Sequence, residues 1–286
     1  MQFELRDLCA DPEISARICL QMMQLMNIVQ VPPYTEEGFK AQVFKTALDL
    51  MSKLSSVRLH KETFLRRYDE RLKYHSARNP KAEGEAFHVE NEKELVSDLE
   101  AFLFQVKSSL DIATKFLIPC AGLGEKKAET FGDAGSGIIK QLRRPHVRAK
   151  SPTARLDILI ALIERHREQW IQEVVEARTH TIHREATQGL IFRFSTEADG
   201  KINLFIPIVT LDGREMTYPD YLTAVERLLF NFCRDFIAVS LYLRAPAFLV
   251  LREMSPEEAI KAWNMPAAEY VRWQLALSVP AAPATG

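Results

Sequence analysis

Apolar residues recur at steps of three and four along most of this chain, which is the period of a helix with one buried face. One such stretch covers residues 92 to 117, a second begins at Ser151-Pro152, and a third follows Thr217. The chain is therefore predicted to be mainly α-helical. The three apolar stripes are Leu95, Leu99, Phe102, Val106, Leu110, Ala113 and Leu117; Leu159, Ile163, His166, Trp170, Val174 and Ala177; and Tyr221, Val225, Leu228, Phe232, Phe236 and Val239.

Residues 1–85 are predicted to form an N-terminal helical extension. Within it, the pattern indicates helices over residues 13–30, from Thr35 to about Leu54, and from about His60 to Tyr74. Residues 80–91 are polar and look like a linker, so we place the boundary of the main helical region, residues 86–286, at this point.

The hydrophobic period changes after Arg184. Leu190 to Phe194 and Ile202 to Val209 are strand-like, and Asp199-Gly200 between them is a turn signal. This pattern predicts one β-hairpin inserted near residues 190–210.

Helix-capping residues mark the last part of the chain. Thr217 followed by Asp220 is an N-terminal signal for the third long helix, and Ser255 begins a short helix that extends to about Asn264. A further helical turn or two is expected through Trp273.

Composition limits the classes of protein to which the chain can belong. Its 286 residues are 47% hydrophobic and 26% charged, enough to bury a core, and the net charge of -1 steers neither nucleic acid nor membranes. The most apolar late run, Phe236 to Leu251, is interrupted by Arg244 and Pro246, so we expect no membrane span. Without paired spacing, the cysteines indicate reduced thiols of a cytoplasmic protein. They are Cys9, Cys19, Cys120 and Cys233.

A basic segment lies between the first two of these helices. Residues 138–156 contain six basic residues and no acid, so Arg143, Arg144 and Arg148 are candidate contacts to an RNA backbone. A solvated loop explains the same pattern equally well. The six are Lys140, Arg143, Arg144, Arg148, Lys150 and Arg155.

The candidate catalytic pair stands where the second long helix is predicted to end. Arg178 and His183 are separated by four residues. A guanidinium holds a phosphate with a planar fork of donors, and a histidine transfers protons near neutral pH. These two side chains in one accessible cleft would suit cleavage of a phosphodiester bond.

Three residues beside the pair are candidate substrate contacts. Thr179 follows the arginine, and Arg184 follows the histidine. His180 forms His-x-x-His with His183, but a zinc site needs about four ligands and no second pair lies near in sequence. We therefore expect no metal here and interpret His180 as a substrate contact or an exposed residue.

This order of helices, with Arg-x4-His at the junction of the last two, resembles the HEPN superfamily. The resemblance covers about residues 90 to 245, and Trp170-Ile171 ahead of Arg178 adds to it. It implies a four-helix bundle, here with an inserted β-hairpin and an N-terminal helical extension. Thr179 departs from the Asn, Asp or His that commonly follows the arginine in that family.

The resemblance also implies an activity. Many HEPN proteins are metal-independent endoribonucleases that need no cofactor, and many act as toxins or defence factors, some with a neutralising protein partner. They tend to form homodimers in which two motifs meet. In this reading the substrate is RNA, and Arg178 and His183 are catalytic.

Geometry sets a condition on this reading. Residues five apart on a continuous helix point about 140° from each other. Arg178 and His183 would share a site only if the helix breaks between them or if a second protomer completes the site. Two other readings remain open: a non-catalytic HEPN-like protein that binds a partner or nucleic acid, and an unrelated helical interaction domain.

Overall fold

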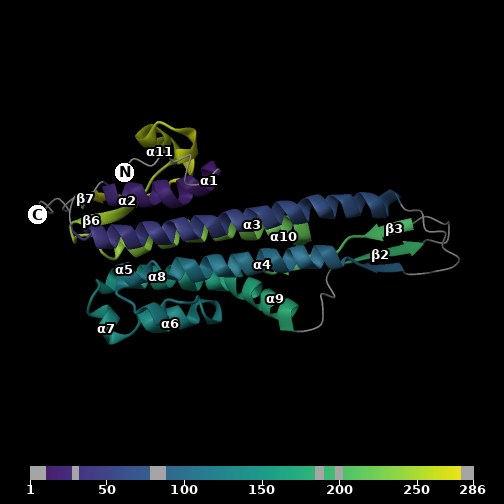
Figure 1. The fold of residues 1–286 in the computed structure, drawn as a ribbon, viewed down its shortest axis with the longest axis horizontal. Coiled ribbons are helices and arrows are strands. Elements are labelled where there is room, and N and C mark those ends of the chain that lie inside the picture. The colour runs from purple at the N-terminus through teal and green to yellow at the C-terminus, as the bar shows by residue number, and fades with distance from the viewer. Residues whose placement is uncertain (1–10, 28–31, 78–87, 184–189, 197–201, 278–286) are drawn as a thin grey trace, which may run out of the picture. The chain divides into compact units, whose positions relative to one another are not determined.

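A computed structural model describes residues 11–27, 32–77, 88–183, 190–196 and 202–277 of the chain (Figure 1). The described chain is mainly helical with few short strands, so the prediction of a mainly α protein is confirmed. The specific four-helix bundle of HEPN type stays a prediction. In chain order the elements are α1 (Pro12–Ser15), η2 (Ala16–Leu20), α2 (Gln21–Asn27), α3 (Glu37–Ala77), β1 (His88–Asn91), α4 (Lys93–Thr114), α5 (Leu117–Ala121), η3 (Glu125–Lys127), η4 (Asp133–Gly135), α6 (Ser136–Leu142), α7 (Pro145–Arg148), α8 (Thr153–His166), η5 (Arg167–Ile171), α9 (Gln172–His183), β2 (Ile191–Thr196), β3 (Ile202–Phe205), β4 (Ile208–Leu211), β5 (Arg214–Thr217), α10 (Tyr218–Tyr242), β6 (Leu249–Glu253), α11 (Pro256–Trp263), η6 (Pro266–Tyr270) and β7 (Trp273–Leu277).

The chain divides into two compact units that interleave along the sequence. The first unit takes its described residues from Met1–Ser55, Ser109–His166 and Phe230–Gly286, and the second from Ser56–Ser108 and Arg167–Leu229. The boundary that we predicted between residues 85 and 86 lies outside the described residues, and the N-terminal extension stays a prediction.

The first unit has an aromatic core. The Phe232 ring is fully buried and lies 5.7 Å from Phe131 and 5.3 Å from Phe236, measured between centroids. The imidazole of His166 packs edge-on against the same ring at 5.1 Å and is 6% exposed. The sequence-based interpretation of His166 as a packed core residue is therefore confirmed.

The second unit contains the predicted hairpin. Strands β2 and β3 pair antiparallel with Arg193 opposite Phe205, and β1 adds to the other edge of β2 with His88 opposite Phe194. The turn residues between β2 and β3 lie outside the described residues. The sheet order is β1-β2-β3, so β3 is an edge strand among the described residues.

A second hairpin follows at once, which the prediction of a single hairpin missed. Residues 202–209 do not form one strand, because β3 ends at Phe205 and β4 begins at Ile208. Strands β4 and β5 then pair across Asp212 and Gly213, whose φ angles of 51° and 69° are those of a type I′ turn.

The prediction of two helices over residues 35–74 was wrong, because α3 is continuous from Glu37 to Ala77. Val57, between the two predicted helices, is fully buried, and Arg58 forms an ion pair with Glu226 of α10 at 3.1 Å. These contacts hold the segment in the helix, and it contains neither proline nor glycine to end it.

Two further expectations need correction. The end of the predicted linker over residues 80–91 is the strand β1. The helical turns expected through Trp273 stop at Tyr270 in η6, and Trp273 begins β7, which pairs with β6 in the first unit. The two predicted caps are confirmed. Thr217 accepts a hydrogen bond from the Asp220 amide at 3.3 Å, and Ser255 begins α11 with a full capping box.

Candidate functional site

Helix α9 carries the motif arginine and is anchored by the residues that precede it. Trp170 and Ile171 of η5 and Val174 of α9 are 0% exposed. The Arg178 side chain is half-buried, and its Cζ lies 5.9 Å from the centroid of the Phe104 ring on α4. Phe104 is 46% exposed. The guanidinium therefore lies beside an aromatic ring at the surface of the second unit.

The motif histidine is placed only by its backbone. Helix α9 is continuous from Gln172 to His183, and the side chains of His180 and His183 lie outside those that the structure describes. Arg184 lies outside the described residues altogether. Because α9 does not break, positions 178 and 183 point about 140° apart around its axis. Arg178 and His183 can therefore share a site only if a second protomer completes it.

Two polar residues around the motif have local partners. The Thr179 hydroxyl is exposed and donates a hydrogen bond to the Val175 carbonyl of its own helix at 2.9 Å. The exposed Glu176 carboxylate accepts a hydrogen bond from Gln172 Nε2 at 2.9 Å. Both contacts are typical of a solvated helix face, so the role of Thr179 as a substrate contact stays a prediction.

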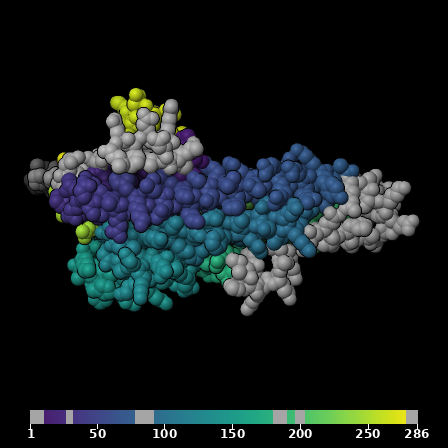
Figure 2. All heavy atoms as spheres, in the orientation of Figure 1, coloured from purple at the N-terminus to yellow at the C-terminus, as the bar shows by residue number. Residues whose placement is uncertain are grey.

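The basic segment of the first unit is partly neutralised. Arg143 pairs with Glu164 at 2.6 Å, and Arg148 pairs with Asp157 at 2.8 Å, in both cases with an acid of α8. Arg143 directly follows α6 and Arg148 is the last residue of α7, and the segment that contains both helices lies on the surface in the space-filling view (Figure 2, teal). Arg144 is exposed and forms no ion pair with any side chain in the described part of the chain. The segment therefore offers less free positive charge than its sequence indicates.

One arginine of the same segment has a different role. Arg155 is 6% exposed, and its guanidinium donates to four carbonyls that follow the end of α10 or lie in its last turn. Its Cζ also lies 4.2 Å from the centroid of the Tyr242 ring. Arg155 is thus a structural residue that closes the C-terminal end of α10, and the prediction that it belongs to the basic patch was wrong. The carbonyls belong to Tyr242, Ala245, Pro246 and Leu249.

A buried polar cluster in the second unit was not anticipated. The fully buried His75 lies with Nε2 2.8 Å from Glu92 Oε1, and Arg71 Nε lies 3.2 Å from the other oxygen of Glu92. The imidazole stacks on Phe192 with 4.7 Å between centroids. This packing places His75 in the interior between helix and sheet, where no substrate reaches it.

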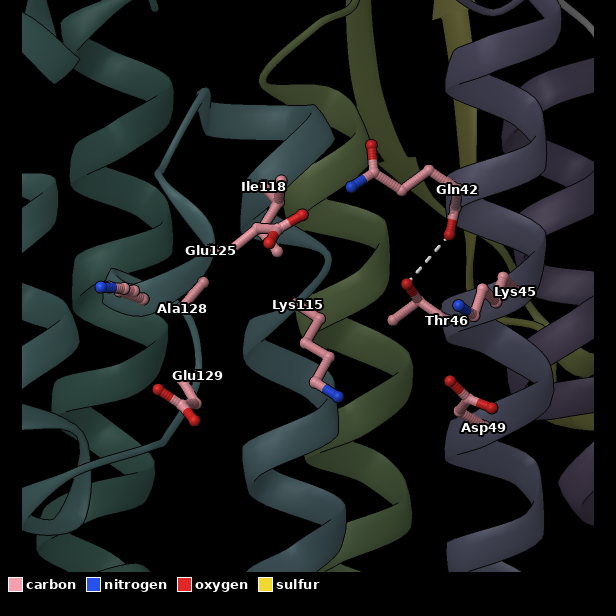
Figure 3. A pocket seen from close by; sticks show the side chains of 10 residues that line it. Gln42, Lys45, Thr46, Asp49, Lys115, Ile118, Glu125, Ala128 and Glu129 are labelled. Atoms are coloured by element: carbon pink, nitrogen blue, oxygen red, sulfur yellow. Dashed lines mark hydrogen bonds between the residues drawn. The ribbon is translucent and has the colours of Figure 1, made fainter.

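A cavity of about 470 Å³ in the first unit lies between α3 and the segment that follows α4. Figure 3 shows Lys45 and Asp49 on one side and Lys115 on the other, with Glu125 and Glu129 above and below it. Because positive and negative side chains alternate around it, the cavity does not select an anion such as phosphate.

A second cavity of about 510 Å³ lies between α8, α10 and the paired strands β6 and β7. Its buried carboxylate, Asp235, accepts hydrogen bonds from Arg234 Nε at 2.9 Å and Trp273 Nε1 at 2.8 Å, and lies 3.3 Å from Arg272 Nη1. These donors engage both carboxylate oxygens, so we assign Asp235 a structural role in linking α10 to the start of β7.

The described cysteines do not form a nucleophilic centre. Cys19, Cys120 and Cys233 are buried and reduced, and Cys9 lies outside the described residues. Burial raises the pKa of Cys120 to about 12 and also raises the pKa of Cys233. Both thiols therefore stay protonated near neutral pH.

The comparisons with known proteins found no relative of this chain. No protein-family model matches the chain. Neither the curated proteins nor the solved structures contain a match. Across the described residues, no helix combines the length and apolar character that crossing a bilayer requires. The described side chains include no group of three or more His, Cys, Asp or Glu arranged to hold a metal ion.

Proposed function

We propose that this chain is a metal-independent endoribonuclease of HEPN type. The observation that carries the proposal is the placement of Arg178 and His183 on one helix, α9, with the guanidinium half-buried at the surface of the second unit. This arrangement offers a phosphate ligand and a proton-transfer group close to each other along the chain.

The reaction uses the 2′-hydroxyl of RNA as its nucleophile. One histidine accepts the proton of that hydroxyl, whose oxygen then bonds to phosphorus. The bond from phosphorus to the 5′-oxygen breaks, and a second, protonated histidine donates its proton to that oxygen. The Arg178 donors stabilise the charge on the crowded phosphate in the transition state. The products are a 2′,3′-cyclic phosphate and a 5′-hydroxyl.

The geometry of α9 favours a site shared by two protomers. One chain supplies one His183, whereas the reaction uses two histidines, and a twofold axis supplies the second. Since positions 178 and 183 diverge by about 140° around α9, Arg178 of one protomer and His183 of its twofold mate can face the same phosphate. The proposal therefore includes a homodimer with paired α9 helices.

Cleavage of labelled RNA by the purified full chain tests the proposal. His183→Ala should lower the rate by roughly 10²–10⁴-fold because proton transfer is lost. Arg178→Ala should cost a similar factor, and Arg178→Lys should restore only part because it lacks the planar fork. Arg227→Ala, which removes an exposed arginine of α10 in the second unit, is the matched control and should cleave normally.

The substrate and metal dependence provide further tests of the mechanism. EDTA should leave the rate unchanged, and DNA, which lacks the 2′-hydroxyl, should not be cut. RNA binding without cleavage under all conditions would replace the nuclease by the non-catalytic alternative. Equal cutting of DNA, or full activity of His183→Ala, would refute the mechanism.

The shared site has its own test. Equal amounts of wild-type and His183→Ala chains, unfolded together and refolded, should show roughly a quarter of the activity of the same total amount of wild type, because only wild-type homodimers keep two histidines. Independent protomers would instead retain about half. The same mixture made with Arg227→Ala should keep full activity.

A further inference from the structure

An aromatic ring occupies a water-facing position of α4. Phe102 and Leu103 just before it are buried, as the amphipathic pattern of the helix requires, but Phe104 is 46% exposed. Ser97, two turns earlier on the same side of α4, is also exposed. Phe104 thus stands where the period of this helix predicts a polar residue, and the ring gains little from the core.

The exposed ring lies beside the motif arginine. The Cζ of Arg178 is 5.9 Å from the centroid of Phe104, close to the limit of about 6 Å for an attraction between a cation and an aromatic face. Single exposed apolar side chains are common on proteins. An exposed ring with a half-buried guanidinium over it is a more specific arrangement, because it combines an apolar plane with a fork of anion donors.

We propose that Phe104 and Arg178 form a nucleotide subsite for single-stranded RNA, in which a nucleobase stacks on the Phe104 ring while Arg178 binds the adjoining phosphate. This inference rests on the proposed function, because it identifies the part of the RNA that lies next to the scissile bond. A nucleotide carries a planar base and a phosphate one sugar apart, and the ring and guanidinium offer a stacking surface and an anion ligand next to each other.

The chemistry of the pair selects the form of the nucleic acid. A base stacks on a protein ring only when it is free of its neighbours, so the subsite excludes duplexes and favours single-stranded segments. Because each base has an aromatic face, stacking on phenylalanine discriminates weakly among the four bases. The proposed subsite therefore makes the enzyme specific for unpaired RNA with little preference for sequence.

Fluorescence anisotropy of labelled homopolymeric single-stranded RNAs measures the subsite directly. The full chain carries His183→Ala to prevent cleavage. Adding Phe104→Ala should weaken binding by about 5-fold to 150-fold, the range for loss of one base–aromatic stack. Phe104→Tyr should bind RNA about as tightly as the chain with Phe104. Phe104→Leu should bind as weakly as Phe104→Ala, since leucine keeps apolar volume but lacks a ring.

A matched control separates stacking from general loss of apolar surface. Phe248 is 54% exposed and belongs to the first unit, and Phe248→Ala should leave RNA binding unchanged. Circular dichroism should show that both alanine variants are folded. Unchanged affinity of Phe104→Ala, or restoration by leucine as good as by tyrosine, would overturn the subsite.

Cleavage by the otherwise wild-type chain distinguishes this failure from failure of the proposed function. If the wild type cuts RNA and Phe104→Ala cuts and binds it equally well, the nuclease stands and the subsite falls. If the wild type does not cut RNA but binds it through Phe104, the catalytic proposal falls and the subsite stands. If the wild type neither cuts nor binds RNA, both fall.

Discussion

Arg155→Ala should destabilise the first unit more than any surface substitution. The buried guanidinium donates through Nη1 to the Tyr242 carbonyl at 3.0 Å and to that of Ala245, and through Nη2 to Pro246 at 2.9 Å and Leu249 at 3.3 Å. These carbonyls lie at and beyond the C-terminus of α10, where a helix favours a positive charge. Alanine removes all four hydrogen bonds at once.

The size of the effect follows from which carbonyls can be rehydrated. Tyr242 and Pro246 are half-buried, so water can replace the guanidinium there, whereas Ala245 and Leu249 are buried. Two hydrogen bonds to a charged donor contribute about 1.5–3 kcal/mol each, and the relieved cost of burying the charge offsets part of this. The free energy of unfolding should therefore fall by about 3–5 kcal/mol.

Urea unfolding followed by circular dichroism measures the change. Arg155→Lys should recover less than about half of the loss, because three donors on one nitrogen cannot reach carbonyls on both sides of the fork. The control is Arg148→Ala, which breaks a partly exposed pair with Asp157 and should cost no more than about 1 kcal/mol. Equal losses for Arg155→Ala and Arg148→Ala would refute the assignment of Arg155 to the helix end.

Three other substitutions have predicted effects. Burial lowers the pKa of His166 to about 4. Between pH 6.5 and pH 4 the folded state therefore binds fewer protons than the unfolded state. The free energy of unfolding should fall by up to about 3 kcal/mol as the pH falls across this window. His166→Leu should make the unfolding midpoint nearly independent of pH across that window. A pH dependence as steep as that of the wild type would contradict the assignment of this effect to His166. Gly135→Ala should cost about 1–3 kcal/mol, because φ is +96° and the new Cβ would lie 2.7 Å from the Phe131 ring. Gly38→Ala, in α3 with no heavy atom within 4 Å of the new Cβ, should instead raise the melting temperature, and the same sign for both would exclude a steric cause.

The features that the sequence predicts correctly are those with a local signal. The caps at Thr217 and Ser255 were found because a cap satisfies backbone amides within three residues of itself. The β2–β3 hairpin was found because alternation and turn chemistry lie in one short stretch. Placement of His166 in the core followed from a helical stripe that the fold preserves.

The missed features depend on partners far along the chain. Trp273 begins a strand because it pairs with Glu253 of β6, which lies beyond α11 and η6 in the sequence, and no local pattern near Trp273 shows this. Arg155 has the same sequence signature as its exposed basic neighbours, and only the end of α10 distinguishes it. Exposure of Phe104 was visible in its position off the apolar stripe, but its neighbour Arg178 belongs to a helix more than 60 residues away.

The interleaving of the two units has a consequence for how this protein can change. Each unit is assembled from separated stretches, and α3, α4 and α10 each contribute residues to both. No terminal deletion or single cleavage therefore yields one unit intact without part of the other. The unit that carries Arg178 consists of two separated stretches, so it cannot be moved to another protein as one continuous segment. Gene fusion or domain shuffling would have to move the whole region over which the two units interleave.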